Sequence, residues 1–132
     1  MCIRDRGDVV VFQLPNWVEA GITFWATAYL GAVIVPIVHF YGAKEVDYIV
    51  RATEPDVVVT AEQFGRNDYL GVYRELLADR PDLLWLVVGD SDETSLPGRA
   101  VRFASVLDHP PVESPTPVDV DSPALVLSLI HI

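Results

Sequence analysis

The hydrophobic and polar positions of the chain follow two alternating patterns, short β-branched runs and longer segments with helical spacing. Four runs are apolar on both faces, as buried parallel strands are: Val9–Leu14, Val33–Pro36, Val57–Thr60 and Leu83–Val88. Three segments between them have helical spacing: Trp17 to about Leu30, Ala43 to about Thr53, and Tyr69–Leu77. Strands that alternate with helices pair in parallel through right-handed crossovers. We therefore predict an α/β fold class, a parallel sheet of repeated βαβ units.

The helical segments carry their own start signals and buried faces. Asn16 and Asp68 stand where side chains cap the first and third helices. In the second helix, Asp47 and Arg51 have the spacing of a surface ion pair, and the face toward the sheet carries Val46, Ile49 and Val50. The first helix is apolar around most of its circumference, so we expect its aromatic residues in a core that extends beyond its own sheet. These residues are Trp17, Trp25 and Tyr29. We expect this fragment to lack part of the protein that covers the helix.

The pattern changes after Gly89. Residues 90–94 form an acidic loop, and Phe103–Leu107 has the composition of a short helix. Five prolines then lie between His109 and Pro123, which is typical of a stiff connector that crosses a surface. The apolar residues of 124–126 resume a strand pattern.

The uncharged run from Ala20 to Tyr41 is long enough to span a bilayer. Gly31 and Pro36 divide it, and the residues between them are mostly β-branched. A buried helix, a tight turn and a buried strand explain this pattern better than a membrane span does. No secretory signal is evident either, and we expect a cytoplasmic protein without a transmembrane span.

The chain is acidic, with a formal net charge of −10, yet 51% of its residues are hydrophobic. Such an apolar fraction indicates a packed domain. Proteins that bind nucleic acid or anionic membranes non-specifically need basic patches, so the charge argues against both classes. The one cysteine, Cys2, lies at the extreme end of the chain, so the sequence offers no disulfide framework and no thiolate metal site.

Both ends of the chain can be read from one short DNA element. Leu127–Ile132 can be written CTG TCT CTT ATA CAC ATC. The complementary strand, with one A added in front and the frame shifted by two bases, encodes Met1–Arg6. This element resembles the transposon-end adapter of sequencing libraries. We expect residues 1–6 and 127–132 to be adapter-derived and non-native, and residues 7–126 to be part of a longer protein.

Motif chemistry in the loops is sparse. The chain has no G-x-G-x-x-G turn, no G-x-x-x-x-G-K-[ST] phosphate loop and no G-x-S-x-G nucleophile elbow. His39 lacks a second ligand at metal spacing, which favours a loop histidine over a metal ligand. Arg66 could hold a phosphate or pair with Asp68. The acidic residues after Gly89 lack the pattern of a calcium loop. We predict no catalytic residue and no metal ligand in this chain.

Four strings in order resemble motifs of the adenylate-forming enzymes, the AMP-binding superfamily of acyl-CoA synthetases, luciferases and peptide-synthetase adenylation domains. Gly7–Trp17 resembles G-D-x-V-x-x-x-L-x-N-x, and Tyr29–Ile37 resembles (R/K)-x-G-A-x-x-x-P-(I/L). Glu45–Val50 is similar to E-(L/I)-x-(Y/H)-(I/L)-L, and Asp56–Thr60 to the strand A-K-(V/L)-(V/L)-(V/I)-x. The family's Gly and Pro suit the turn after the first helix, because Gly31 can adopt a positive φ and Pro36 ends a strand.

The resemblance implies an N-terminal fragment of an acid–CoA ligase. In the family, a strand introduced by D-x-A-x-(L/I)-x-Y leads into a phosphate loop rich in Ser, Thr and Gly, and Asp121–Val126 resembles that introduction. The later motifs lie beyond this chain, so we expect the fragment to be inactive and to bind no cofactor tightly. The parent is expected to use ATP, Mg²⁺ and CoA to activate a small carboxylic acid, with the missing remainder of its own domain as partner.

By position, the resemblance also implies CoA-binding residues in the loops after the second and third strands: His39, Phe40, Tyr41 and Arg66. It implies a partial AMP-binding N-terminal subdomain over residues 7–108 and a connector with the start of the next strand over 109–126. An aryl, alicyclic or medium-chain acid is expected, with fatty acid metabolism as the setting. Two alternatives stay open, an adenylation module that loads a carrier protein and a non-enzymatic α/β binding domain.

Overall fold

The computed structural model describes residues 7–127, and the adapter prediction for Met1–Arg6 and Ser128–Ile132 lies outside them. The helices and strands occur in this order: β1 (Val9–Gln13), α1 (Val18–Tyr29), β2 (Val33–Pro36), α2 (Ala43–Thr53), β3 (Val57–Ala61), β4 (Gln63–Phe64), β5 (Asn67–Asp68), α3 (Tyr69–Leu76), β6 (Leu84–Val88), the 3₁₀ turn η1 (Glu93–Ser95), β7 (Val101–Arg102) and α4 (Phe103–Val106).

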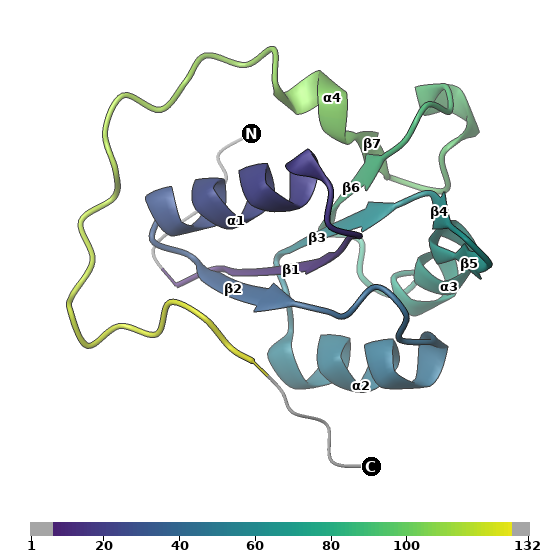
Figure 1. Ribbon diagram of the computed structural model, residues 1–132, viewed down its shortest axis with the longest axis horizontal. Coiled ribbons are helices and arrows are strands. Elements are labelled where there is room, and N and C mark those ends of the chain that lie inside the picture. The colour runs from purple at the N-terminus through teal and green to yellow at the C-terminus, as the bar shows by residue number, and fades with distance from the viewer. Residues whose placement is uncertain (1–6, 128–132) are drawn as a thin grey trace.

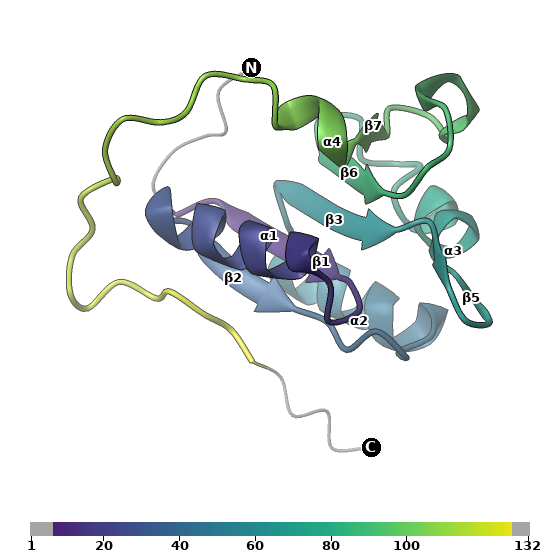
Figure 2. The same ribbon diagram turned by 45° about the horizontal axis from the view of Figure 1, so that its top comes forward.

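Five strands form one parallel sheet in the order β2-β1-β3-β6-β7. Helices α1 and α4 lie over one face of the sheet, and α2 and α3 lie over the other (Figures 1 and 2). The predicted α/β class with repeated βαβ units is therefore confirmed. Strand β1 lies between β2 and β3, so the chain first adds β2 on one side of β1 and then reverses direction to add β3 on the other side. A doubly wound sheet places its ligand crevice at such a reversal, beyond the carboxyl ends of the strands.

The sheet interior consists mainly of valine, as the doubly apolar runs predict. The central strands β1 and β3 pair from Val10 with Val57 to Gln13 with Thr60. Val11 and Val58 are fully buried between the sheet and its helices. Burying an aliphatic side chain of this size contributes about 1.5–3 kcal/mol, so these strands form the centre of the folded core.

Local predictions for the second and third helices hold. The buried face of α2 carries Val46, Ile49 and Val50. The Arg51 guanidinium lies 2.7 Å from the Asp47 carboxylate on its exposed face. In α3, the Asp68 side chain accepts a hydrogen bond from the N–H of Gly71 at 3.0 Å. This carboxylate occupies the space that a Cβ at residue 71 would need, so a larger residue there would displace the capping side chain.

The first helix differs from its prediction at both its start and its buried face. Asn16 does not cap it: the cap position is Trp17, and no side chain hydrogen bonds there. Trp25 is 72% exposed rather than part of the core, and Trp17 and Tyr29 are also exposed. The residues buried on this helix are Thr23 and Thr27. Their hydroxyls donate to the carbonyls four residues earlier, so these small polar side chains can face the sheet while the large aromatic ones stay outside.

The predicted turn after α1 is present, whereas residues 124–126 form an isolated β-bridge and not the predicted strand. Gly31 has φ of 68°, the left-handed conformation expected after a helix. The proline-rich connector then loops out from α4 and returns beside β2 (Figure 1). There Leu125 forms a parallel bridge with Ile34, and the N–H of Val126 donates to the Ile34 carbonyl at 2.8 Å. The predicted short helix is α4, whereas β4, β5, η1 and β7 were not predicted.

No helix within residues 7–127 is long and apolar enough to cross a membrane. The uncharged run from Ala20 to Tyr41 instead spans most of α1, the turn and β2.

Candidate functional site

Aromatic rings from three loops meet at the carboxyl edge of the sheet. Trp17 follows β1, His39 and Phe40 follow β2, and Phe64 lies in the β4–β5 hairpin that follows β3. The ring centroids of Trp17 and Phe64 are 5.8 Å apart, those of His39 and Phe64 5.6 Å, and those of His39 and Phe40 5.3 Å, all edge to face. We call these four residues the aromatic cluster. The cluster connects the loops that follow β1, β2 and β3. Phe40 is its most exposed ring, at 65%.

A buried glutamine holds the loop after β2 by hydrogen bonds. Gln13 ends β1 and is almost fully buried. Its side-chain amide donates to the backbone carbonyls of Val38 and Tyr41, each at 3.0 Å. Two bonds from one amide fix both ends of the four-residue loop 38–41.

The same loop is held from the side by the segment after β3. The carbonyl of His39 accepts hydrogen bonds from the Asn67 side-chain amide at 3.2 Å and from the Tyr69 hydroxyl at 2.7 Å. Tyr69 is the first residue of α3 and is buried. The loop that carries the His39 ring is therefore held by the last residue of β1 and by the segment that follows β3.

Tyr73 completes this network inside the protein. Its hydroxyl donates to the carbonyl oxygen of the Gln13 side chain at 3.1 Å. Burial raises the pKa of Tyr73 well above its ordinary value, and the nearby Tyr69 adds to the increase. The neutral hydroxyl is thus the stable form, and it is the form that can donate to Gln13.

A cavity of about 440 Å³ lies beside the anchored loop. It is lined by residues of β1, of the start of α2, of the β4–β5 hairpin and of α3: Gln13, Tyr41, Gly42, Ala43, Arg66, Asn67, Asp68, Tyr69, Gly71, Val72 and Glu75. Two of the four predicted CoA-binding residues, Tyr41 and Arg66, line it, and the other two belong to the aromatic cluster. The structure therefore brings the four predicted residues to one edge of the sheet.

Arg66 is exposed at this cavity. Within residues 7–127 the ion pair joins Arg51 and Asp47, so Arg66 does not form one with Asp68, whose carboxylate accepts from the Gly71 N–H. A guanidinium without a carboxylate partner can form two parallel hydrogen bonds with a phosphate or carboxylate.

The start of α2 adds backbone donors to the same cavity. Gly42 is the N-cap residue, and its N–H donates to the Glu45 carboxylate at 3.1 Å. The remaining N–H groups of a first helical turn have no partner within the helix, which makes a helix start favourable for anions. Glu45 places a negative charge at the same position, so Arg66 has to supply much of the attraction for an anionic group.

Metal ligands are lacking in the part of the chain that the structure describes. No group of three His, Cys, Asp or Glu side chains between residues 7 and 127 is arranged to hold a metal ion. In the acidic loop, the Asp92 carbonyl accepts from the Ser95 N–H, so this segment closes the 3₁₀ turn η1.

Several residues of this site were not identified from the sequence. Trp17 was assigned to the core, and Phe64 lies in a hairpin of two-residue strands that has no periodic pattern. A signal for Gln13 was available, because it is the one polar residue in the run from Val9 to Leu14. A buried amide in a parallel strand needs specific partners.

Comparisons with known proteins agree on one family. The family model described as AMP-binding enzyme matches residues 4–127. The salicyl-AMP ligase / salicyl-S-ArCP synthetase of Mycobacterium tuberculosis is 33% identical over 122 residues, which cover 92% of this chain and 21% of that protein. The chain thus spans about a fifth of the length of this curated relative.

Solved structures share the fold. A mutant form of coronafacic acid ligase from Pectobacterium brasiliense superposes with a TM-score of 0.76 at 18% identity, over 92% of this chain and 23% of that one. The apo structure of MbtA from Mycobacterium smegmatis gives 0.67 at 24% identity, over 88% and 20%. A long-chain fatty-acid CoA ligase structure from Rhodopseudomonas palustris gives 0.64 at 22% identity, over 79% and 24%. The family match over nearly the whole chain and the fold together show that this chain belongs to the AMP-binding enzymes, the adenylate-forming family.

Proposed function

We propose that the parent of this chain is an ATP-dependent, AMP-forming acid–CoA ligase of the cytoplasm. In the first step a carboxylate oxygen attacks the α-phosphorus of ATP, which forms an acyl-adenylate and releases pyrophosphate. In the second step the CoA thiol attacks the acyl carbon, which forms the thioester and releases AMP and the thiol proton. The single observation that supports an assignment to CoA is the cavity at the carboxyl edge of the sheet, with the unpaired Arg66 and the aromatic cluster beside it.

The chemistry of this edge fits the adenosine-phosphate part of CoA. Arg66 can pair with a phosphate in bidentate geometry. The exposed ring of Phe40 and the ring of His39 offer surfaces on which an adenine can stack, a contact worth about 1–3 kcal/mol per base in single-strand binding proteins. Tyr41 lines the same cavity. The roles of Gln13 and Tyr69 are to hold the loop that carries these rings.

We assign ATP and Mg²⁺ to the rest of the parent. Mg²⁺ requires carboxylate or phosphate oxygens, and residues 7–127 present no suitable group of ligands.

We propose that the biological part of the chain is residues 7–126, and that this part is inactive alone. It consists of a partial subdomain over 7–108 and a connector over 109–126. The codons that follow Val126 in the uninterrupted gene are expected to encode a loop rich in Ser, Thr and Gly that ends in Lys. Codons without such a loop would contradict this division.

A carrier protein is the alternative acyl acceptor. The name of the Mycobacterium tuberculosis relative describes a salicyl-S-ArCP synthetase, and that relative is 33% identical to this chain. Family membership argues against a non-enzymatic binding domain. The acceptor is decided by supplying the uninterrupted protein with ATP, Mg²⁺ and aryl, alicyclic or medium-chain acids, together with either CoA or a pantetheinylated carrier. We expect a thioester with CoA. A thioester with the carrier alone would establish the alternative.

Arg66→Gln in the uninterrupted protein tests the site itself. Loss of one charged bidentate contact is expected to raise the KM for CoA about tenfold. Acid-dependent exchange between ATP and pyrophosphate needs no CoA and is expected to stay unchanged. Arg51→Gln is the matched control, because Arg51 is exposed on α2 and pairs with Asp47. An unchanged KM for CoA in the Arg66 variant would contradict the assigned site.

A further inference from the structure

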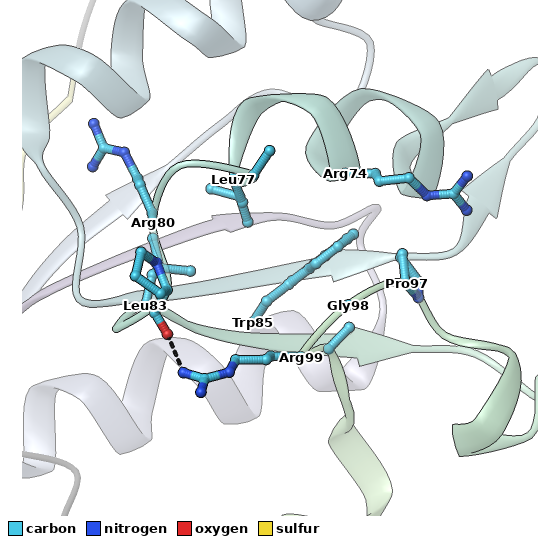
Figure 3. A pocket seen from close by; sticks show the side chains of 11 residues that line it. Arg74, Leu77, Arg80, Leu83, Trp85, Pro97, Gly98 and Arg99 are labelled. Atoms are coloured by element: carbon cyan, nitrogen blue, oxygen red, sulfur yellow. Dashed lines mark hydrogen bonds between the residues drawn. The ribbon is translucent and has the colours of Figure 1, made fainter.

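A second cavity lies near the amino ends of β6 and β7, away from the carboxyl-edge cavity. It has a volume of about 290 Å³ and lies between the end of α3, the start of β6 and the segment before β7 (Figure 3). The apolar side chains that line it include Leu77, Leu83, Trp85 and Pro97.

Trp85 is one of the apolar residues that line this cavity. It is only 5% exposed, and its indole N–H donates to the Thr60 hydroxyl at 3.0 Å. The one polar atom of the ring is therefore already satisfied inside the protein, and what the ring offers the cavity is an aromatic surface. Such a surface favours a flat or aliphatic group over water.

Three arginines lie at the rim of this cavity: Arg74 from α3, Arg80 from the turn after it, and Arg99 from the segment before β7. In Figure 3 the Arg74 and Arg80 side chains extend away from Trp85 on opposite sides. The chain has only nine Lys and Arg residues against nineteen Asp and Glu. Within residues 7–127 none of the three is in an ion pair, since the pair that is present joins Arg51 and Asp47. Arg99 donates to the Pro81 carbonyl at 2.5 Å, which engages one of its five N–H groups.

We propose that this cavity binds a small organic anion, an aryl or short-chain alkyl carboxylate or phosphate monoester. The apolar part of the ligand lies against Trp85 and Leu77, and the anionic group pairs with a guanidinium group at the rim. A volume of 290 Å³ admits a small molecule and no folded partner. A free inorganic anion would leave the apolar surface uncovered, and a neutral ligand would leave the guanidinium groups without a partner. The site is independent of the proposed CoA cavity.

The test uses the indole N–H resonance of Trp85 in ¹H–¹⁵N spectra of the chain, identified with Trp17→Phe and Trp25→Phe variants. Phenyl phosphate and benzoate combine both ligand features, inorganic phosphate has only the anion, and benzyl alcohol has only the apolar ring. At constant ionic strength we expect phenyl phosphate and benzoate to shift the resonance saturably, and the other two probes to leave it unchanged. If the isolated chain gives no dispersed spectrum, the same titration is read in the uninterrupted protein.

The arginines are tested by an Arg74→Gln/Arg80→Gln double variant, which is expected to weaken phenyl phosphate binding at least about tenfold because charged contacts to the anion are lost. Arg51→Gln on α2 is the matched control and should bind phenyl phosphate like the unmodified chain. The proposal is overturned if neither phenyl phosphate nor benzoate gives a saturable shift up to about 10 mM, a concentration above the Kd of most specific sites. Equal binding of inorganic phosphate or benzyl alcohol, or full binding by the double variant, would also overturn it.

Discussion

Gln13 interrupts an apolar strand, and its side chain explains how the candidate site is held. The amide is buried and forms three hydrogen bonds at the carboxyl edge of the sheet: it donates to the carbonyls of Val38 and Tyr41 and accepts from Tyr73. A buried amide without such partners would cost several kcal/mol. The network therefore links the loop after β2 to α3 through the end of β1.

Tyr73→Phe tests this network. The substitution removes the hydroxyl and leaves the Gln13 carbonyl oxygen buried without its donor, so it is expected to lower the free energy of unfolding by about 1–3 kcal/mol. Urea unfolding followed by circular dichroism measures the change. Tyr48→Phe is the control, because Tyr48 is exposed on α2, and it should have an effect close to zero. Equal stability of the two variants would show that the Tyr73 bond does not support the fold.

The raised pKa of Tyr73 also predicts a pH dependence of stability. An unfolded tyrosine loses its proton near pH 10, whereas burial keeps folded Tyr73 protonated at higher pH. Above about pH 10 the unfolded state thus binds fewer protons than the folded state, and the stability present below that pH declines as the pH rises. Urea titrations between pH 8 and 11 should show a steeper decline for the unmodified chain than for Tyr73→Phe. Parallel curves would contradict the prediction.

Residue patterns predicted local contacts better than they predicted which side of a helix is buried. The Asp68 cap and the pair of Asp47 with Arg51 depend on spacing along one helix, and both are present. Trp25 was expected in a core that extends beyond the sheet, and it is exposed in this chain, because a side chain's environment depends on what packs over the helix. Thr23 and Thr27 can face the sheet because their hydroxyls bond to their own helix.

Among the elements within residues 7–127, α1 has a side that no other element covers. Its exposed apolar residues are Val18, Ile22, Trp25 and Tyr29. Beside it, an apolar groove of about 440 Å³ runs between α1 and α4 over β1, β3 and β6. Isolated exposed apolar residues are ordinary, but several on one helix beside an apolar groove mark an interface. This supports the proposal that residues 7–108 are part of a larger subdomain.

A Val18→Ser/Trp25→Ser double variant tests whether another part of the parent protein covers α1. In the isolated chain both side chains are exposed, so the unfolding free energy should change by less than about 1 kcal/mol, while self-association measured by sedimentation should decrease. In the uninterrupted protein the same change should cost about 3–5 kcal/mol, since Trp25 would be buried there. A small effect in both proteins would contradict the inferred cover.

The sequence predicted the longer elements and missed the short ones for a physical reason. Strands such as β1 and β3 and helices such as α2 contain enough residues for a period to be recognised. Strands β4, β5 and β7 have two residues each, which is too short for a period to be recognised. The edge strand β7 also depends on its pairing with β6, which lies earlier in the sequence. Phe64 in the β4–β5 hairpin is therefore a site residue that only the fold could identify.

For the whole molecule, parallel topology explains why the candidate site could be located in part from the sequence. The carboxyl ends of parallel strands meet at one edge, so the loops after β2 and β3 converge there, and Tyr41 and Arg66 line one cavity. The contact of Trp17 with Phe64 across that edge depends on the order of the strands in the sheet, which no local pattern contains.

We infer that this chain is a structural part of an adenylate-forming ligase whose phosphate chemistry lies elsewhere in the parent. The most direct measurement is acid-dependent exchange of labelled pyrophosphate into ATP, assayed side by side for the isolated chain and the uninterrupted protein with the same panel of carboxylic acids. We expect exchange by the uninterrupted protein with at least one acid and no exchange by the isolated chain. Exchange by the isolated chain, or release of ADP in place of AMP by the uninterrupted protein, would contradict it.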